Sequence, residues 1–430
     1  MTLNPSNITA IVLDHGLYIH VAQKLAESYK RVMYFSPWTE GGFPSSKRRQ
    51  IGCGIEGVER VFDLWDAVGE ADLIVACDVY YHDVVQYLRE AGRPVWGAGK
   101  AEALEVERYA TKQLMESLGM NVIPYQAVEG VTALWRYLAD KEDLWIKGSN
   151  TRGDLETFHW INGHVSAPRL EKLLRDIGPR RYSMEFIIEP TISGVEFGYD
   201  GYCVDGCFSA IALYGPEAKD AGYVGRVVSF DDLPNLIRQP TLELAGTMGQ
   251  LICRGFYSNE IRIADEGSEE FKIPPGTPFL IDPAMRCGSP PSESYIELFS
   301  NWDEVIWAGA NGEVVDLLPT AKFAAQIVLK SDWVSENEYL PVHFPDDIAR
   351  WVKLHNCCIL DGEYTVVPQD FPEFGSVVGL GNTQVEAERH CIEHAKQIEA
   401  IDLDWRRDVF DEIHKVIADG RTVGIDWEGE

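Results

Sequence analysis

Residues 186–196 read Phe-Ile-Ile-Glu-Pro-Thr-Ile-Ser-Gly-Val-Glu. An apolar run ends in an acid, Glu189, and a short linker follows. A second acid, Glu196, comes two residues after Gly194. We interpret the segment as a strand, a hinge and the start of a second strand. Such a hinge would present backbone groups at Ile192 to an adenine ring and the Glu196 carboxylate to ribose hydroxyls.

Upstream of the hinge, cationic side chains stand where nucleotide phosphates could be held. Lys147 ends the apolar run Leu144–Lys147 and precedes a loop, residues 148–153, rich in Gly, Ser and Thr. Backbone N–H groups of such a loop can approach phosphate oxygens closely. Arg108 and Lys112 lie four residues apart and share one face of a helix expected over 102–118. The alternatives are an ordinary exposed hairpin and a solvated helix surface.

Downstream of the hinge, two acids lie inside apolar strands. Glu260 falls within residues 255–264, GFYSNEIRIA, and Asp282 within residues 278–286, PFLIDPAMR. A carboxylate in such a position is costly unless it is paired or binds a metal ion. Mg²⁺ is commonly held by one or two carboxylates together with phosphate oxygens. The alternative is a buried ion pair with Arg262 or Arg286.

The first hundred residues alternate short apolar strands with amphipathic helices, which predicts a parallel, Rossmann-like sheet. Its strands are expected at 8–14, 31–36, 72–77 and 94–99. The sequence Asp14-His15-Gly16-Leu17 does not match the dinucleotide-binding pattern GxGxxG, so we expect no nucleotide in this domain. The expected domains are 1–100, 101–190, 191–330 and 331–430. The last is a small α+β domain with strands near 364 and 376, a helix over 383–399 and a fraying acidic end at 420–430.

Composition narrows the class of protein. The chain has 430 residues, enough for several domains, and a formal charge of −30, which disfavours nucleic acid as a partner. No apolar run is long enough to span a bilayer, and the N-terminus lacks a signal-peptide pattern. The nine cysteines are scattered without a CxxC spacing. We therefore expect a cytoplasmic protein with reduced thiols, monomeric or homodimeric, with no membrane partner.

The order of these features resembles the ATP-grasp superfamily and, more closely, the glycinamide ribonucleotide synthetase (phosphoribosylamine–glycine ligase) family. Residues 72–128 are similar to that family in register and character. FIIEPTISGVE resembles its adenine hinge, FLIDPAMRCGSP its metal-binding strand, and residues 375–399 its C-terminal domain. The resemblance implies an α/β and α+β multidomain protein: a Rossmann-like N-terminal domain, an ATP-grasp fold and a small C-terminal α+β domain.

The resemblance also implies cofactors and residue roles. The cofactors are ATP and Mg²⁺. Arg108 and Lys147 match residues that contact the phosphates, and Arg152 matches a flexible lid cation. The hinge and ribose positions fall on Glu189, Ile192 and Glu196, the metal carboxylates on Glu260 and Asp282, and the arginine that steadies the transferred phosphoryl group or the substrate on Arg286.

The departures from the family concern the substrate side. Ala284 replaces a metal-binding Asn, residues 288–291 replace an acidic turn, and the N-terminal Gly-rich turn is missing. We therefore expect an ADP-forming ligase that joins a small carboxylate, such as an amino acid, to an amine through an acyl phosphate. One alternative, favoured by Ala284, is a nucleotide-binding protein that has lost turnover. Another is a kinase of the same fold, which would stop at a phosphorylated product.

Overall fold

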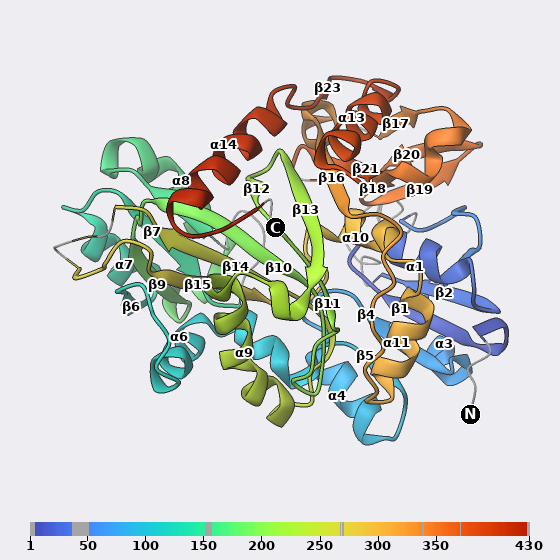
Figure 1. The fold of residues 1–430 in the computed structure, drawn as a ribbon, viewed down its shortest axis with the longest axis horizontal. Coiled ribbons are helices and arrows are strands. Elements are labelled where there is room, and N and C mark those ends of the chain that lie inside the picture. The colour runs from blue at the N-terminus through green and yellow to red at the C-terminus, as the bar shows by residue number, and fades with distance from the viewer. Residues whose placement is uncertain are drawn as a thin grey trace. The chain divides into compact units, whose positions relative to one another are not determined.

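The computed structural model describes residues 5–36, 51–150, 157–266, 268, 271–337, 339–369 and 371–427 (Figure 1). The chain forms two compact units. The first unit comprises residues 1–101, 197–259 and 284–419, and the second comprises 102–196, 260–283 and 420–430. Within the described ranges, no helix combines the length and the apolar character needed to span a membrane.

The first unit begins with the parallel sheet that the sequence predicts. Its order is β3-β2-β1-β4-β5, so the strand order reverses between β1 and β4. The strands are β1 (Thr9–Leu13), β2 (Arg31–Phe35), β3 (Val58–Arg60), β4 (Leu73–Ala76) and β5 (Val95–Trp96). Only β3 was not expected. It is three residues long and none of its residues is fully buried, so it carries no apolar signal.

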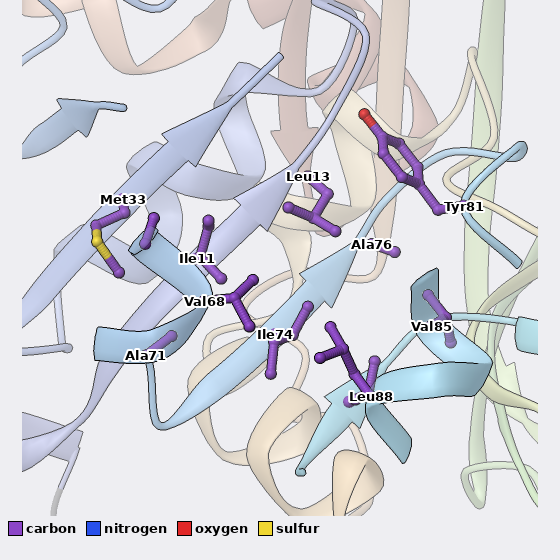
Figure 2. Packing of buried hydrophobic residues seen from close by; sticks show 12 residues of the cluster. Ile11, Leu13, Met33, Val68, Ala71, Ile74, Ala76, Tyr81, Val85 and Leu88 are labelled. Atoms are coloured by element: carbon purple, nitrogen blue, oxygen red, sulfur yellow. The ribbon is translucent and has the colours of Figure 1, made fainter. Parts of the chain in front are cut away.

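An apolar layer covers one face of this sheet. Ile11, Met33 and Ile74 project from the strands, and Val68 and Leu88 meet them from helices α3 (Leu64–Glu70) and α4 (His82–Glu90) (Figure 2). Asp63 caps α3 by accepting hydrogen bonds from the N–H groups of two following residues. Helices α1 (Ile19–Ala26) and α11 (Trp302–Ala310) contact each other and the strands from the other side. The sheet is therefore covered on both faces, as parallel sheets usually are.

The remainder of the first unit is β-rich. It contains β11 (Ile211–Gly215), β13 (Gly222–Ser229), β16 (Phe323–Ser331), β18 (Val352–Leu354) and β21 (Glu373–Gly381), paired in that order except that β21 lies between β16 and β18. A small sheet has the order β19-β20-β17-β22, with β19 (Cys357–Leu360), β20 (Glu363–Val366), β17 (Leu340–His343) and β22 (Glu399–Ala400). The predicted C-terminal helix is α13 (Gln384–Ala395). Thr383 and Glu386 form a capping box at its N-terminus.

The second unit contains an antiparallel sheet with the order β6-β9-β7-β8. The strands are β6 (Gln126–Glu129), β9 (Glu185–Pro190), β7 (Leu144–Gly148) and β8 (Thr157–Trp160). One face packs on helices α7 (Val131–Leu138) and α8 (Gly163–Asp176) through a core that includes Ile146, Phe158 and Phe186. Because side chains alternate along a strand, Lys147 and Glu189 project from the opposite face.

The helix expected over 102–118 is interrupted. A 3₁₀ turn (Gly99–Glu102) leads into α5 (Ala103–Val106), and α6 (Arg108–Ser117) starts after Glu107, whose backbone leaves the helical region. The predicted end at Gly119 is confirmed, since Gly119 has φ of 75°. Three further strands cross the boundary between the units: β10 (Gly194–Val204), β14 (Arg254–Ala264) and β15 (Pro278–Ala284). The second unit holds residues 194–196, 260–264 and 278–283 of these strands.

Candidate active site

The site is built first on the face of the small sheet that points away from its core. In the pairing of β7 with β9, Trp145 lies opposite Glu189 and Lys147 opposite Ile187. Lys147 and Glu189 are therefore diagonal neighbours on one face, close enough for long side chains to meet. Lys147 Nζ lies 3.4 Å from Glu189 Oε2, and both side chains are buried.

Helix α6 adds two more cations. Lys112 Nζ lies 2.5 Å from Glu189 Oε1, and Arg108 is buried on the same face of the helix. The side chains of Arg108 and Lys112 are each only 6% exposed, so the interpretation of this face as a solvated surface is wrong. A helix face with two buried cations requires acidic partners, and β9 supplies one of them.

The charges in this cluster perturb each other. Burial opposes ionisation of Glu189, but the nearby charges of Lys147 and Lys112 outweigh it and lower the pKa of Glu189 to about 2. Burial lowers the pKa of Lys112, as does the charge of Lys147, although Glu189 acts in the opposite direction. Glu189 is thus a fixed negative charge between two ammonium groups.

The end of β15 closes the cluster. Lys147 Nζ donates a hydrogen bond to the carbonyl oxygen of Ile281 at 3.1 Å. Arg108 lies 3.4 Å from the Asp282 carboxylate. The structure thus gives Asp282 an ion pair with Arg108, and it pairs Arg262 with Glu196. Three cationic side chains thus gather around the Glu189 and Asp282 carboxylates, and cations grouped in this way suit a polyanionic ligand.

Glu260 lies on β14, which neighbours β15 in the sheet, and it is partly exposed like Asp282. Two accessible carboxylates on neighbouring strands are hard oxygen donors of the kind that Mg²⁺ prefers. In the part of the chain that the structure describes, no group of three His, Cys, Asp or Glu side chains is arranged to hold a metal ion. A magnesium ion here would draw its other oxygens from phosphates and water, which is its usual coordination in nucleotide sites.

The hinge has the predicted strand–linker–strand form. Ile192 is buried against Ile123, Ala264 and Phe279, among others. Gly194 starts β10, and a Cβ at this position would lie 2.1 Å from the carbonyl oxygen of Ile263 on β14. Only glycine permits this close approach, which fixes the hinge against the neighbouring strand.

Arg262 is the cation that the hinge uses. Its Nη2 lies 2.6 Å from Glu196 Oε2, and its Nη1 donates to the carbonyl oxygens of Ile192 and Gly194 at 3.3 and 3.4 Å. The Glu196 carboxylate is thereby oriented while it stays partly exposed. Arg262 had been considered only as a partner for Glu260 or Asp282.

Two predicted site residues remain, Arg286 and Arg152. Arg286 follows Asp282 by four residues and belongs to the first unit, where its Nη1 donates to the Tyr18 hydroxyl at 3.2 Å. Arg152 lies outside the described residues. Lys112 was noted beside Arg108 but was given no role of its own, and Arg262 was not predicted as a site residue. Lys112 has a sequence signal, its spacing of four from Arg108, whereas the pairing of Arg262 with Glu196 crosses 66 residues and has none.

Several solved structures are similar in fold to nearly the whole chain. Phosphoribosylamine–glycine ligase from Thermotoga maritima is 16% identical and superposes with a TM-score of 0.69, covering 93% of this chain and 100% of its own. Biotin carboxylase from Campylobacter jejuni, in complex with β-γ-ATP, is 13% identical and superposes with a TM-score of 0.62, covering 95% of this chain and 98% of its own. L-amino acid ligase from Bacillus licheniformis is 13% identical and superposes with a TM-score of 0.57, covering 94% of this chain and 100% of its own.

The sequence itself has diverged far from these proteins. No protein-family model matches it, and no curated protein sequence does. At these identities the similarity concerns the fold, and it extends over nearly the full length of each chain. The predicted architecture is confirmed: the chain has the multidomain fold of the ATP-grasp enzymes.

Proposed function

We propose that this protein is a cytoplasmic, ADP-forming ligase that couples a small carboxylic acid to an amine through an acyl phosphate. The observation that carries the proposal is the cluster of Arg108, Lys112 and Lys147 around the Glu189 and Asp282 carboxylates. Cationic side chains gathered in this way suit a polyanion, and the triphosphate of ATP is one. The hinge beside the cluster supplies the contacts for the nucleoside.

Each part of the site has a role in holding ATP. Lys147 and Arg108 contact phosphate oxygens, and Glu189 with Lys112 holds Lys147 in place. Backbone groups at Ile192 contact the adenine ring, and Glu196, oriented by Arg262, accepts hydrogen bonds from the ribose hydroxyls. The partial exposure of Glu196 agrees with this assignment. The outcome is a fixed orientation for the γ-phosphate, and positioning of this kind carries much of phosphoryl-transfer catalysis.

Glu260 and Asp282 would hold Mg²⁺, as their donor chemistry fits. When bound, Mg²⁺ neutralises developing charge on the phosphates. Ala284 removes a side-chain oxygen that related proteins use, and water would take that position. Arg286 and Arg152 complete the proposal as the cations that steady the transferred phosphoryl group and cover the phosphates.

The reaction has two steps. A carboxylate oxygen of the acid attacks the γ-phosphorus, the bond to the β-phosphate oxygen breaks, and ADP leaves. The amine then attacks the acyl carbon of the mixed anhydride, an amide bond forms, and inorganic phosphate leaves. The solved structures of similar fold include an L-amino acid ligase, which supports amino acids as the first class of acid to test.

The test measures ADP release and product formation against a panel of amino acids, each with and without an added amine, in the presence of Mg²⁺ and ATP. We expect ADP release that requires the acid, and hydroxamate formation when hydroxylamine is added to trap the acyl phosphate. A stable phosphorylated product that no amine consumes would identify a kinase instead. ATP binding without ADP release for any pair would identify a protein that has lost turnover.

A further inference from the structure

Beside the N-terminal sheet lies a second group of polar and titratable side chains, which has no role in the proposed nucleotide site. In open parallel sheets, ligands bind beyond the carboxyl ends of the strands, where the strand order reverses. Here the reversal lies between β1 and β4. The segments that follow these two strands bring His15 and Asp78 together, with His15 Nδ1 3.3 Å from Asp78 Oδ2.

The backbone around His15 is held firmly. The buried Asp14 carboxylate accepts hydrogen bonds from the N–H groups of His15 at 2.7 Å and Tyr18 at 2.9 Å, and from the Tyr34 hydroxyl at 2.5 Å. On the carbonyl side, Gly16 O accepts from the N–H of Asn356 at 2.6 Å. These hydrogen bonds hold the backbone of the turn in one conformation, and a reactive side chain needs a rigid backbone of this kind to keep its geometry.

The His15 ring is oriented by its surroundings while it remains accessible. Its centroid lies 4.9 Å from that of Tyr81, and Tyr80 meets it edge-on at 6.5 Å. The His15 side chain is 21% exposed, whereas that of Asp78 is 1% exposed. Tyr80 holds a left-handed backbone conformation, φ 73°, although it is not glycine and is 44% exposed. Strain of this kind persists where the surrounding structure enforces it, commonly at functional sites.

The same group adjoins the proposed catalytic arginine. Arg286 Nη1 donates to the Tyr18 hydroxyl at 3.2 Å, and the N–H of Cys287 donates to the carbonyl oxygen of Cys77 at 3.0 Å. The segment after β1 and the segment after β4 are thus each hydrogen-bonded to residues 286–287. All these residues belong to the first unit.

We propose that His15 is the general base that receives the proton of the amine substrate, and that Asp78 is the positioning residue that fixes the His15 ring. This inference rests on the ligase function proposed above. With Nδ1–H donated to Asp78, the lone pair of the neutral ring is on Nε2. An imidazole oriented by a carboxylate is an established arrangement for proton abstraction, because the carboxylate sets the tautomer and stabilises the imidazolium that forms.

The proton balance follows from the charge of the amine. A basic amine is protonated at neutral pH and cannot attack until it loses that proton. His15 Nε2 accepts it, and the neutral nitrogen then forms the bond to the acyl carbon. The carbon–oxygen bond to the phosphoryl group breaks, and the second N–H proton leaves with inorganic phosphate. His15 returns the first proton to solvent. The amine substrate of this step is therefore of the basic, cationic class, and the exposed Tyr80 ring beside His15 offers such a cation an aromatic face.

The test compares His15→Gln with the wild type, using the acid and basic amine that give the highest wild-type ADP release in the panel above. Amide formation should fall about 100-fold or more, the range expected for loss of a general base. Hydroxamate formation from hydroxylamine, which is largely uncharged at neutral pH, should stay within about threefold of wild type. His82→Gln, an exposed histidine at the start of α4, is the matched control and should leave both rates unchanged.

The rates of amide and hydroxamate formation distinguish failure of the His15 proposal from failure of the proposed ligase function. Unchanged amide formation in His15→Gln overturns the role of His15 alone, and so does an equal loss of amide and hydroxamate. A wild type that forms neither ADP nor hydroxamate overturns the ligase function and the inference with it. Asp78→Asn provides a second measurement if His15→Gln does not fold. It should also lower the ratio of amide to hydroxamate, a ratio that a purely structural residue would not change.

Discussion

The carboxylate of Glu189 lies 2.5 Å from the ammonium group of Lys112 in the interior of the second unit, and Lys147 approaches the same carboxylate from the other side at 3.4 Å. This pairing links helix α6 to the strand that precedes the hinge. It makes the stability of the unit sensitive to acid, and it determines how Lys147 is presented to a ligand.

The first prediction concerns that acid sensitivity. The pKa of Glu189 is lowered from 4.5 to about 2, so its contribution to stability is present above pH 4.5 and is lost as the pH falls toward 2. The free energy of unfolding should decrease by about 3 kcal/mol across this window from Glu189 alone. Urea unfolding between pH 2.5 and 6 measures the decrease.

The matched variants isolate this contribution. Glu189→Gln should be less stable at pH 7 by about 3 kcal/mol or more, because two buried cations lose their partner. Its stability should also depend less steeply on pH than that of the wild type. Glu129→Gln, an exposed acid on the same sheet, should follow the wild type. Equal acid slopes for the wild type and Glu189→Gln would show that the pairing is absent in solution.

The second prediction concerns the phosphates. Lys147→Met should weaken binding of a non-hydrolysable ATP analogue by about 10- to 100-fold, the value of a charged hydrogen bond of 1.5–3 kcal/mol. Glu189 keeps Lys112 as a partner, so the fold should be retained. Lys141→Met, an exposed lysine before β7, is the control. Titration calorimetry measures the affinity of each variant for the analogue. Equal affinities for Lys147→Met and the wild type would exclude Lys147 from the phosphate site.

The third prediction concerns the ribose. Glu196→Gln should weaken ATP binding about tenfold, because a neutral amide is a poorer acceptor for the ribose hydroxyls than a carboxylate. Binding of 2′,3′-dideoxy-ATP should change little, since that nucleotide lacks the hydroxyls. An equal loss for both nucleotides would mean that Glu196 acts only through its ion pair with Arg262.

The fourth prediction concerns the turn that carries His15. Gly16 has φ of 111°, and a Cβ there would lie 2.0 Å from Asn356 Oδ1. Gly16→Ala should therefore destabilise the protein by about 1–3 kcal/mol. In the Asn356→Gly background the cost should be smaller, because only the backbone strain remains. The same cost in both backgrounds, measured by urea unfolding, would show that the two residues do not meet.

Much of the fold could be predicted because it depends on local apolar patterns. Apart from β3, the strands of the N-terminal sheet lie in apolar runs, and the helix at 384–395 begins with a capping box that is visible in the sequence. Two features could not be predicted in this way. The break at Glu107 is a backbone feature without proline or glycine at the break itself. The acidic end was expected to fray, yet Ile425 and Trp427 are buried, because apolar side chains outweigh the charges beside them.

The candidate site was predicted only in part for a related reason. Spacing shows that Arg108 and Lys112 share a helix face, but their burial depends on acids more than 70 residues away in the chain. The hinge was recognised because its glycine and its two acids lie within one short segment. Its cation, Arg262, comes from a distant strand. Local chemistry is therefore readable from the sequence, whereas the pairing of charges follows from the fold.

The most direct test of the central claim is ADP release by Asp282→Asn. Asp282 is partly exposed, and its contacts with Arg108 are long, at 3.4 and 3.5 Å, so the fold should be retained. Loss of a charged metal ligand should cost on the order of 3 kcal/mol in the transition state, about a hundredfold in rate. Asp265→Asn, an exposed acid at the end of β14, should release ADP as the wild type does. ADP release that is indifferent to Asp282→Asn would mean that the carboxylate is structural, and the proposed ligase function would be wrong.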